Sequence, residues 1–307
     1  MRLNIRHTTT YYYDQPVLLG PHYFRLTPRA DSYEALRGHA VRIVPQPVSL
    51  NASLESDGSV SHNAHFNGET KVFSVESRIV LDLCPYKNPF DFLITPQQCR
   101  VLPMVYPSQL AEDLKIFLDS QKVNTAVRHF ADDILQKSKN DALEFLITLA
   151  KTMKKEFVYE FRFAGAPNEP QKTLLDKRGS CRDWALLYMA AARAVGLASR
   201  FVSGYYFDAM PQNPQLHAWV EVYIPGGGWK GFDPTLGLAC YGRHIALASS
   251  ASSALAAPIQ GTFIGNAKAK MEVSLDYRFS SRQEKRKNKS PKYQPIRPRE
   301  KSIIFQK

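Results

Sequence analysis

The most informative segment of the sequence is Gly179-Ser180-Cys181-Arg182-Asp183-Trp184-Ala185-Leu186-Leu187-Tyr188-Met189-Ala190-Ala191-Ala192-Arg193-Ala194-Val195-Gly196. Apolar side chains recur in it at steps of three and four residues, and Gly196 is a typical stop, so a helix is predicted to begin at Cys181. The unpaired N–H groups and the dipole at a helix N-terminus stabilise a thiolate, the form of cysteine that attacks carbonyl carbon. A free cysteine is more often a small buried hydrophobic residue, so the residues downstream must decide between the two.

A strand is predicted downstream, over residues 216–224, because apolar residues alternate there with other types. His217 and Trp219 fall on the face opposite the aliphatic side chains, where they are available to a cleft. Because Trp219 shares the face of His217, we consider it a candidate substrate-binding residue. A proline-glycine turn at residues 225–228 is followed by a short strand that ends at Asp233.

Three of these side chains fit one catalytic scheme. A cysteine nucleophile needs a base, and the base needs a partner that fixes its tautomer, so Cys181, His217 and Asp233 can fill these roles in that order. A tight hairpin that paired Ile224 with Trp229 would place Asp233 opposite Val220 rather than His217. A contact between Asp233 and His217 then requires a β-bulge, a longer turn or a diagonal cross-strand contact, and the sequence does not choose among these three.

Four separated motifs carry a family resemblance: Gly179-Ser-Cys-Arg-Asp-Trp184, Arg200-Phe-Val-Ser-Gly-Tyr205, His217-Ala-Trp-Val-Glu-Val-Tyr223 and Gly228-Trp-Lys-Gly-Phe-Asp-Pro-Thr235. These motifs, in this order, resemble those of the bacterial transglutaminase-like superfamily, a papain-like group of cysteine enzymes. The resemblance covers roughly residues 155–240. Residues 13–29 resemble the β-rich N-terminal domain usual in this family. The resemblance implies the triad Cys181, His217 and Asp233, but it leaves the reaction open among peptidases, amidases and acyl transferases.

The expected fold class is α+β. An N-terminal β-sandwich-like domain at residues 1–100 should precede a papain-like transglutaminase core at 101–279, in which helices pack on an antiparallel sheet. Residues 59–66 and 70–83 are predicted to form a hairpin about Asn67-Gly68, a favoured two-residue turn. In the core, helices are predicted over about 108–120, 124–138 and 141–154.

Several residues near the motifs receive less specific predictions. Asp183 lies in the first turn of the predicted helix and is expected to be structural, Trp229 to pack, and His244 to lie on a strand surface. Related folds complete the oxyanion hole with a side chain from the upstream region. No upstream Gln or Trp is convincingly placed here, so the backbone N–H of Cys181 is the only donor we name.

Composition limits the remaining function classes. Ten Lys and Arg oppose two Glu between Arg278 and Lys301, so this segment carries +8 of the net charge of +12. We expect residues 280–307 to be a basic disordered tail, with no specific nucleic-acid binding. The four cysteines form no C-x-x-C pair, and neither a signal core nor a membrane span is evident, which predicts a cytoplasmic protein in a reduced compartment. No metal or cofactor motif is found.

The sequence thus predicts an enzyme that cleaves peptide or carboxamide bonds through a thioacyl intermediate, by hydrolysis or by transfer to an amine. Its expected partner is a peptide or protein substrate. The alternative is a non-catalytic protein-binding module that retains the fold. The bland stretch at residues 249–257, which consists mostly of small side chains, keeps that alternative open, whereas the presence of all three triad residues argues against it.

Overall fold

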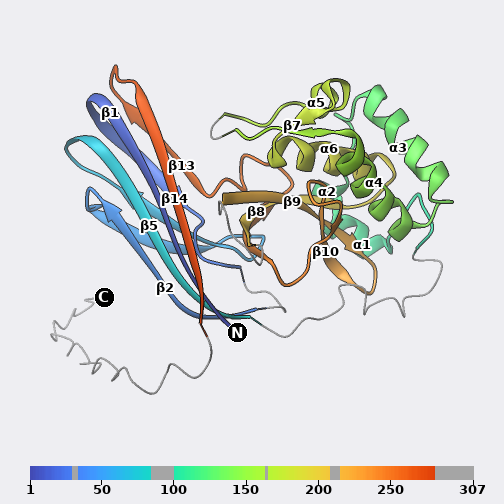
Figure 1. The fold of residues 1–307 in the computed structure, drawn as a ribbon, viewed down its shortest axis with the longest axis horizontal. Helices are drawn as coiled ribbons and strands as arrows, with labels where there is room; N and C mark the ends of the chain where they lie inside the picture. The colour runs from blue at the N-terminus through green and yellow to red at the C-terminus, as the bar shows by residue number, and fades with distance from the viewer. Residues whose placement is uncertain (30–33, 84–99, 163–164, 208–214, 281–307) are drawn as a thin grey trace, which may run out of the picture.

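The computed structural model describes residues 1–29, 34–83, 100–162, 165–207 and 215–280. These residues form two large β-sheets, with helices against one of them, and a small two-stranded sheet (Figure 1). The first sheet is organised around one long strand, β1 (Arg2–Phe24). Its other strands are β2 (Glu34–Val44), β3 (Ser49–Leu54), β4 (Val60–His65), β5 (Glu69–Leu83), β13 (Ile259–Ile264) and β14 (Ala269–Ser280). The path runs β2-β5-β1-β4-β3, with β13 and β14 also paired to β1.

This N-terminal sheet differs from the expectation in two ways. A sandwich is not confirmed, because all seven described strands join one sheet about β1. The two C-terminal strands, which lie in the range we assigned to the core, hydrogen-bond to β1 instead: residues 2–13 pair with residues 269–280. The chain therefore returns to its own beginning after the core. The basic tail lies outside the described residues.

The predicted hairpin about Asn67-Gly68 is wrong. Gly68 does turn the chain, with φ of +82°, but the strands on either side of it do not pair with each other. Strand β4 pairs with β3 and β1, whereas β5 pairs with β1 and β2. Local turn chemistry thus identified the turn but not the partners of its strands.

The core contains a five-stranded antiparallel sheet in the order β11-β10-β9-β8-β12. These strands are β8 (Ser199–Tyr206), β9 (Gln215–Ile224), β10 (Gly228–Asp233), β11 (Leu238–Ala239) and β12 (His244–Ser250). The helices are α1 (Ser108–Asp113), α2 (Lys115–Leu118), α3 (Thr125–Lys137), α4 (Ala142–Glu156), α5 (Pro170–Asp176) and α6 (Cys181–Ala194). Helix α6 packs against β9, and α3, α4 and α5 pack around it.

The predicted helices are present with small changes at their ends. The segment at 108–120 divides into α1 and α2 at Leu114, and Asn124 and Asp141 cap α3 and α4 with their side chains. Among the described residues, no helix is both long and apolar enough to cross a membrane.

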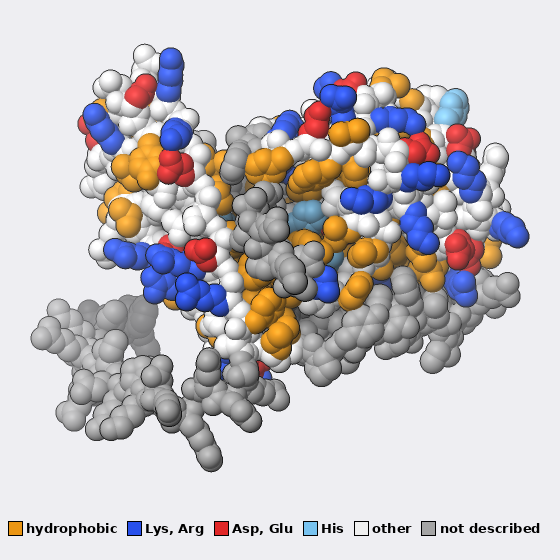
Figure 2. Space-filling model, viewed as in Figure 1, with side chains coloured by type: hydrophobic (Ala, Val, Ile, Leu, Met, Phe, Trp, Pro, Cys, Tyr) orange, Lys and Arg blue, Asp and Glu red, His pale blue; other side chains and the backbone are white. Residues whose placement is uncertain are grey.

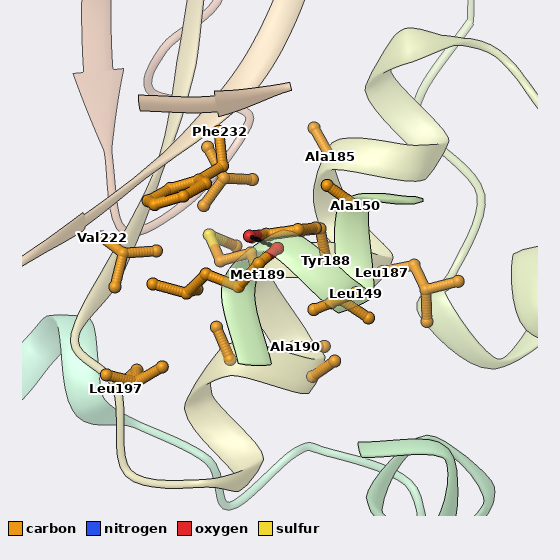
Figure 3. Close-up of a cluster of buried hydrophobic side chains, with 14 of the residues drawn as sticks. Leu149, Ala150, Ala185, Leu187, Tyr188, Met189, Ala190, Leu197, Val222 and Phe232 are labelled. Atoms are coloured by element: carbon orange, nitrogen blue, oxygen red, sulfur yellow. Dashed lines mark hydrogen bonds between the residues drawn. The ribbon is translucent and has the colours of Figure 1, made fainter. Parts of the chain in front are cut away.

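Helix α6 is held by a continuous apolar core (Figure 3). Tyr188 and Met189 of the helix face Val222 and Phe232 of the sheet, and Leu149 of α4 lies on the helical side. The buried Tyr188 hydroxyl donates to the Leu146 carbonyl at 2.8 Å, which satisfies its polar group inside the core. Helix α6 is therefore fixed relative to both β9 and β10.

The two sheets share a second apolar cluster. Tyr205, Phe207, Ile245 and Leu247 of the core segment pack with residues of β1 and β5, among them Leu3, Phe73 and Ile79. Polar contacts accompany this packing, because the Tyr205 hydroxyl lies 3.0 Å from His7 Nδ1. The N-terminal sheet thus packs against strands β8 and β12 of the core sheet.

Candidate active site

Cys181 is the first residue of α6, as predicted, and it is 8% exposed. The helix begins with a capping box in which the Asp183 carboxylate accepts from the backbone N–H and the hydroxyl of Ser180, at 2.6 and 2.8 Å. The preceding Gly179 is needed for this arrangement, since a Cβ there would lie 2.8 Å from the Asp183 Cβ. Arg162 and the Asn168 N–H also donate to Asp183. The structural role predicted for Asp183 is confirmed.

His217 lies near the start of β9 and connects the two other candidate residues. Its Nε2 is 2.7 Å from Asp233 Oδ2, and its ring is hydrogen-bonded to the thiol of Cys181. Because Nε2 of His217 is hydrogen-bonded to the Asp233 carboxylate, Nδ1 is the ring nitrogen that interacts with the Cys181 sulfur. The structure therefore brings Cys181, His217 and Asp233 into one chain of contacts.

Asp233 reaches His217 by a diagonal contact across the sheet. The observed hairpin pairs Ile224 with Gly228 and Val220 with Phe232, one residue out of the register considered from sequence. If this register continues by one residue, Asp233 lies opposite Trp219 of β9. His217 is two residues before Trp219 and its side chain is on the same face of the sheet, so it is the diagonal neighbour of Asp233. The turn length thus decides the contact that the sequence left open.

The Asp233 carboxylate is completely buried, and both of its oxygens accept hydrogen bonds. Its Oδ1 accepts from the N–H and hydroxyl of Thr235 at 2.9 and 2.7 Å, while its Oδ2 accepts from His217. A second histidine, His244, donates to the same Oδ2 through its Nε2 at 2.9 Å. This set of donors keeps a buried carboxylate ionised.

His244 is the residue that sequence reasoning placed wrongly. We expected it on a strand surface, but its side chain is 5% exposed and points at Asp233 from β12. Strand alternation gave no sign of this contact, because β12 adjoins β8 and not the strands that carry His217 and Asp233. Its closeness in sequence to the Asp233 motif was the one available clue.

The electrostatics of the site favour a thiolate next to an imidazolium. Burial raises the pKa of the Cys181 thiol, but the hydrogen bond and charge of His217, the N–H of Ala218 and the charge of Arg182 together lower it below its usual value. Burial lowers the pKa of His217, yet Asp233 and Cys181 outweigh this and raise it to about 10. Burial also lowers the pKa of His244, which its hydrogen bond to Asp233 does not reverse. His244 is therefore neutral at neutral pH.

Trp219, the predicted substrate-binding residue, is only 2% exposed. Its indole is enclosed by glycines of the neighbouring strands, because a Cβ on Gly204 would lie 2.6 Å from the ring and one on Gly231 3.4 Å from Nε1. Its ring stacks on that of His217 with centroids 6.3 Å apart. Trp219 lines a small pocket together with Trp229, Lys230, Tyr241 and His244. A role in binding substrate stays a prediction, whereas support of His217 follows from the contact.

Trp229 packs, as predicted. It lies against Phe117 and Tyr223, and the Arg200 guanidinium is 4.2 Å from its ring centroid. On the face shown in Figure 2, histidine side chains are visible among apolar ones near the middle of the core.

The same histidines and aspartate could be considered as metal ligands. One ligand atom from each of His217, Asp233 and His244 lies within 4.8 Å of the others. Two N–H···O hydrogen bonds to one carboxylate oxygen already account for this spacing. We therefore interpret the cluster as a hydrogen-bonded network, and the absence of a metal stays a prediction.

Tyr159 is a further neighbour of the sulfur that the sequence did not indicate. It lies in β6 (Val158–Tyr159), which pairs in parallel with β7 (Arg178–Gly179), and its hydroxyl is hydrogen-bonded to the Cys181 thiol. Nothing in the local pattern of residues 157–163 connects this tyrosine with a cysteine 22 positions later.

Comparisons with known proteins identify two matching families and several relatives. The model of the transglutaminase-like superfamily core matches residues 128–234, and that of the bacterial transglutaminase-like N-terminal region matches residues 3–82. A Mycobacterium tuberculosis protein described as uncharacterized is 27% identical over 292 residues, which cover 90% of this chain and 92% of that protein. A Mycobacterium leprae protein described in the same way is 22% identical, with 90% and 98% covered.

A solved structure extends the likeness to the whole fold. It is that of a proposed cysteine protease from Cytophaga hutchinsonii, and it superimposes with a TM-score of 0.67 at 21% identity over 92% of each chain. At this identity the likeness concerns the fold. The chain therefore contains a transglutaminase-like superfamily core at residues 128–234 and a bacterial transglutaminase-like N-terminal region at residues 3–82.

Proposed function

We propose that this protein is a cysteine-dependent acyl-transfer enzyme that acts on peptide or carboxamide bonds through a thioacyl intermediate. One observation carries the proposal: the imidazole of His217 is hydrogen-bonded at once to the Cys181 thiol and to the buried carboxylate of Asp233. Packing alone does not require a sulfur, an imidazole and a carboxylate in this order. Nucleophilic catalysis by cysteine does.

The proposed steps use only groups of this site. The Cys181 thiolate attacks the carbonyl carbon, and the tetrahedral intermediate expels its amine, which takes a proton from the imidazolium of His217. A thioester remains on Cys181. His217, now neutral, removes a proton from water or from an amine, which attacks the thioester and releases the acyl product together with the thiolate. Asp233 stays ionised throughout and holds the His217 ring.

We favour hydrolysis over transfer to an amine. Water reaches any open site, whereas amine transfer requires a cleft that excludes water from the second step. The Cytophaga hutchinsonii protein is itself described as a proposed protease, which agrees with a hydrolytic outcome. We further propose that Trp219 supports the bound substrate beside His217, and that the enzyme works in the cytoplasm, where its thiol stays reduced.

Selective alkylation tests the proposal. At pH 6, iodoacetamide should label Cys181 much faster than the other cysteines, and the selectivity should disappear in His217→Ala. Incubation with a peptide and primary-amine library, followed by mass spectrometry, should then reveal an acyl adduct on Cys181 and whether water or amine discharges it. Slow and equal labelling of all four cysteines would instead favour the non-catalytic binding module.

A further inference from the structure

The proposed reaction requires more hydrogen-bond donors than the triad supplies. When sulfur attacks, the carbonyl oxygen becomes an oxyanion, and preorganised donors at that oxygen supply a large part of the rate enhancement of acyl transfer. The N–H of Cys181 is one such donor, because the first N–H groups of a helix have no partner within it. No upstream Gln or Trp is convincingly placed in the sequence to provide the second donor.

Tyr159 is held next to the nucleophile by backbone pairing. The parallel strands β6 and β7 align Tyr159 with Gly179, two residues before Cys181, and the Glu160 N–H donates to the Gly179 carbonyl at 2.8 Å. The rings of Tyr159 and Trp184 of α6 make a T-shaped contact, with centroids 6.2 Å apart and planes at 80°. The position of this ring is therefore set by both the strand and the helix that place the sulfur.

The Tyr159 hydroxyl combines two properties that the site needs. It touches the Cys181 sulfur, so a carbonyl carbon bonded to that sulfur would bring its oxygen within reach. The residue is also 43% exposed, so substrate can approach it. We propose that Tyr159 is a catalytic residue whose O–H donates the second hydrogen bond to the oxyanion, beside the N–H of Cys181. This role rests on the proposed acyl-transfer function.

Two other N–H donors fit the role less well. The indole N–H of Trp184 has no hydrogen-bond partner among the described residues, but the side chain is 1% exposed and closed to substrate. The N–H of Ala218 donates to the sulfur and is fixed in strand β9. A phenolic O–H rotates about its C–O bond, so it can follow the negative charge as this moves from sulfur to oxygen.

The step conserves atoms and charge. The thiolate electron pair forms the S–C bond, the C=O π pair moves to oxygen, and the Tyr159 proton stays on Tyr159 while hydrogen-bonding that oxygen. Collapse of the intermediate restores the C=O bond and expels the leaving group with the His217 proton. A tyrosine that remains protonated suits this task, and burial, together with the nearby thiolate, raises the pKa of Tyr159 well above its usual value.

Two reagents separate this role from simple activation of the thiol. p-Nitrophenyl acetate acylates the sulfur through an oxyanion and releases p-nitrophenolate, whereas iodoacetamide alkylates it at a saturated carbon without forming one. At the pH plateau of each reaction, Tyr159→Phe should slow single-turnover acylation about 100-fold and change the alkylation rate by less than about threefold. Tyr23→Phe, at a 40% exposed tyrosine of β1, is the matched control and should change neither rate.

The remaining outcomes would overturn the proposal in distinguishable ways. If Tyr159→Phe slows both reactions equally, the tyrosine acts on the thiol and not on the oxyanion. If it slows neither, Tyr159 has no part in the step. If wild-type protein and Cys181→Ala release p-nitrophenolate at the same rate, the acyl-transfer function itself fails, whatever Tyr159 does. Equal melting temperatures of wild type and Tyr159→Phe would exclude misfolding as the cause of a slower reaction.

Discussion

The chemistry of the site depends on one buried carboxylate that serves two imidazoles. His217 and His244 both donate to Asp233 Oδ2, yet their pKa values move in opposite directions. His217 also faces a thiol that can become negative, whereas the field of His217 disfavours a second positive charge on His244. One carboxylate thus supports a charged acid and a neutral hydrogen-bond donor side by side.

This asymmetry predicts a wide pH range for the reactive thiol. Because the pKa of Cys181 is lowered and that of His217 is raised to about 10, the iodoacetamide rate should stay high well below pH 8 and fall only as the thiolate is protonated. Acyl turnover should decline above about pH 10, where His217 loses the proton it gives to the leaving group. In His217→Ala the alkylation rate should rise only at higher pH, because burial raises the pKa of the Cys181 thiol and His217 no longer opposes that effect. Identical pH profiles for both proteins would contradict the ion pair.

The same shift links His217 to stability. Its folded pKa lies above its unfolded value of about 6.5, so the stabilisation from protonating His217 is complete below about pH 6.5 and is lost as pH rises through about 10. Urea unfolding of wild type and His217→Ala at several pH values should therefore show a stability difference that shrinks on the alkaline side.

His244 is predicted to position Asp233. His244→Leu removes a donor from a fully buried carboxylate, which should lower the free energy of unfolding by about 2 kcal/mol. Acylation should also become slower, because the oxygen of Asp233 that faces His217 loses one of the two histidines that hold it in place. His244→Gln keeps an N–H donor and should restore most of the acylation rate. His129→Leu, at an exposed position of α3, is the control in urea unfolding and acylation kinetics. A full rate in His244→Leu would argue against positioning.

Among the elements, α6 and the hairpin of β9 and β10 could be predicted because their signals are local. The apolar period, the capping residues and the strand alternation all lie within a few residues of Cys181, His217 and Asp233. The register of β9 against β10 could not be predicted, since one residue of turn length changes the partner of Asp233. His244 and Tyr159 were missed because their contacts come from strands whose positions depend on the whole core.

The start of α6 is predicted to be the most sensitive element. Asp183 accepts four hydrogen bonds while completely buried, including one from the partly exposed Arg162. Asp183→Asn replaces one acceptor oxygen by a donor and leaves these groups poorly satisfied, so the free energy of unfolding should fall by about 2 kcal/mol or more. Asp132→Asn, on the exposed face of α3, should change it little. Urea unfolding of both variants checks this, and equal stabilities would show that the capping network contributes nothing.

For the whole molecule, the N-terminal sheet and the core are joined by a buried polar cluster. Glu221 of β9 is paired with Arg200 and with Arg29, a residue that follows β1. Arg29 also donates to the Ser249 hydroxyl at 2.7 Å, and the Ser249 N–H donates to Asp57 at 2.6 Å. These contacts hold β9, which carries His217, and β12, which carries His244, against the N-terminal region. The bland residues that begin at Ser249 therefore contribute to an internal contact.

The return of the chain to β1 predicts how the protein tolerates truncation. A chain that ends at residue 258 lacks β13 and β14 and leaves one edge of β1 unpaired from Arg2 to Tyr13. An exposed edge of this length invites aggregation, and the cluster shared with Tyr205 and Ile245 loses Leu275. The shortened protein should therefore be recovered mainly as aggregate and lose Cys181 reactivity, although every triad residue is present. A chain that ends at residue 280 lacks only the basic tail and should keep the melting temperature and alkylation rate of the full-length protein. Size-exclusion chromatography, thermal unfolding and iodoacetamide labelling of both chains measure this, and a soluble, reactive protein ending at 258 would show that the core does not depend on the completed N-terminal sheet.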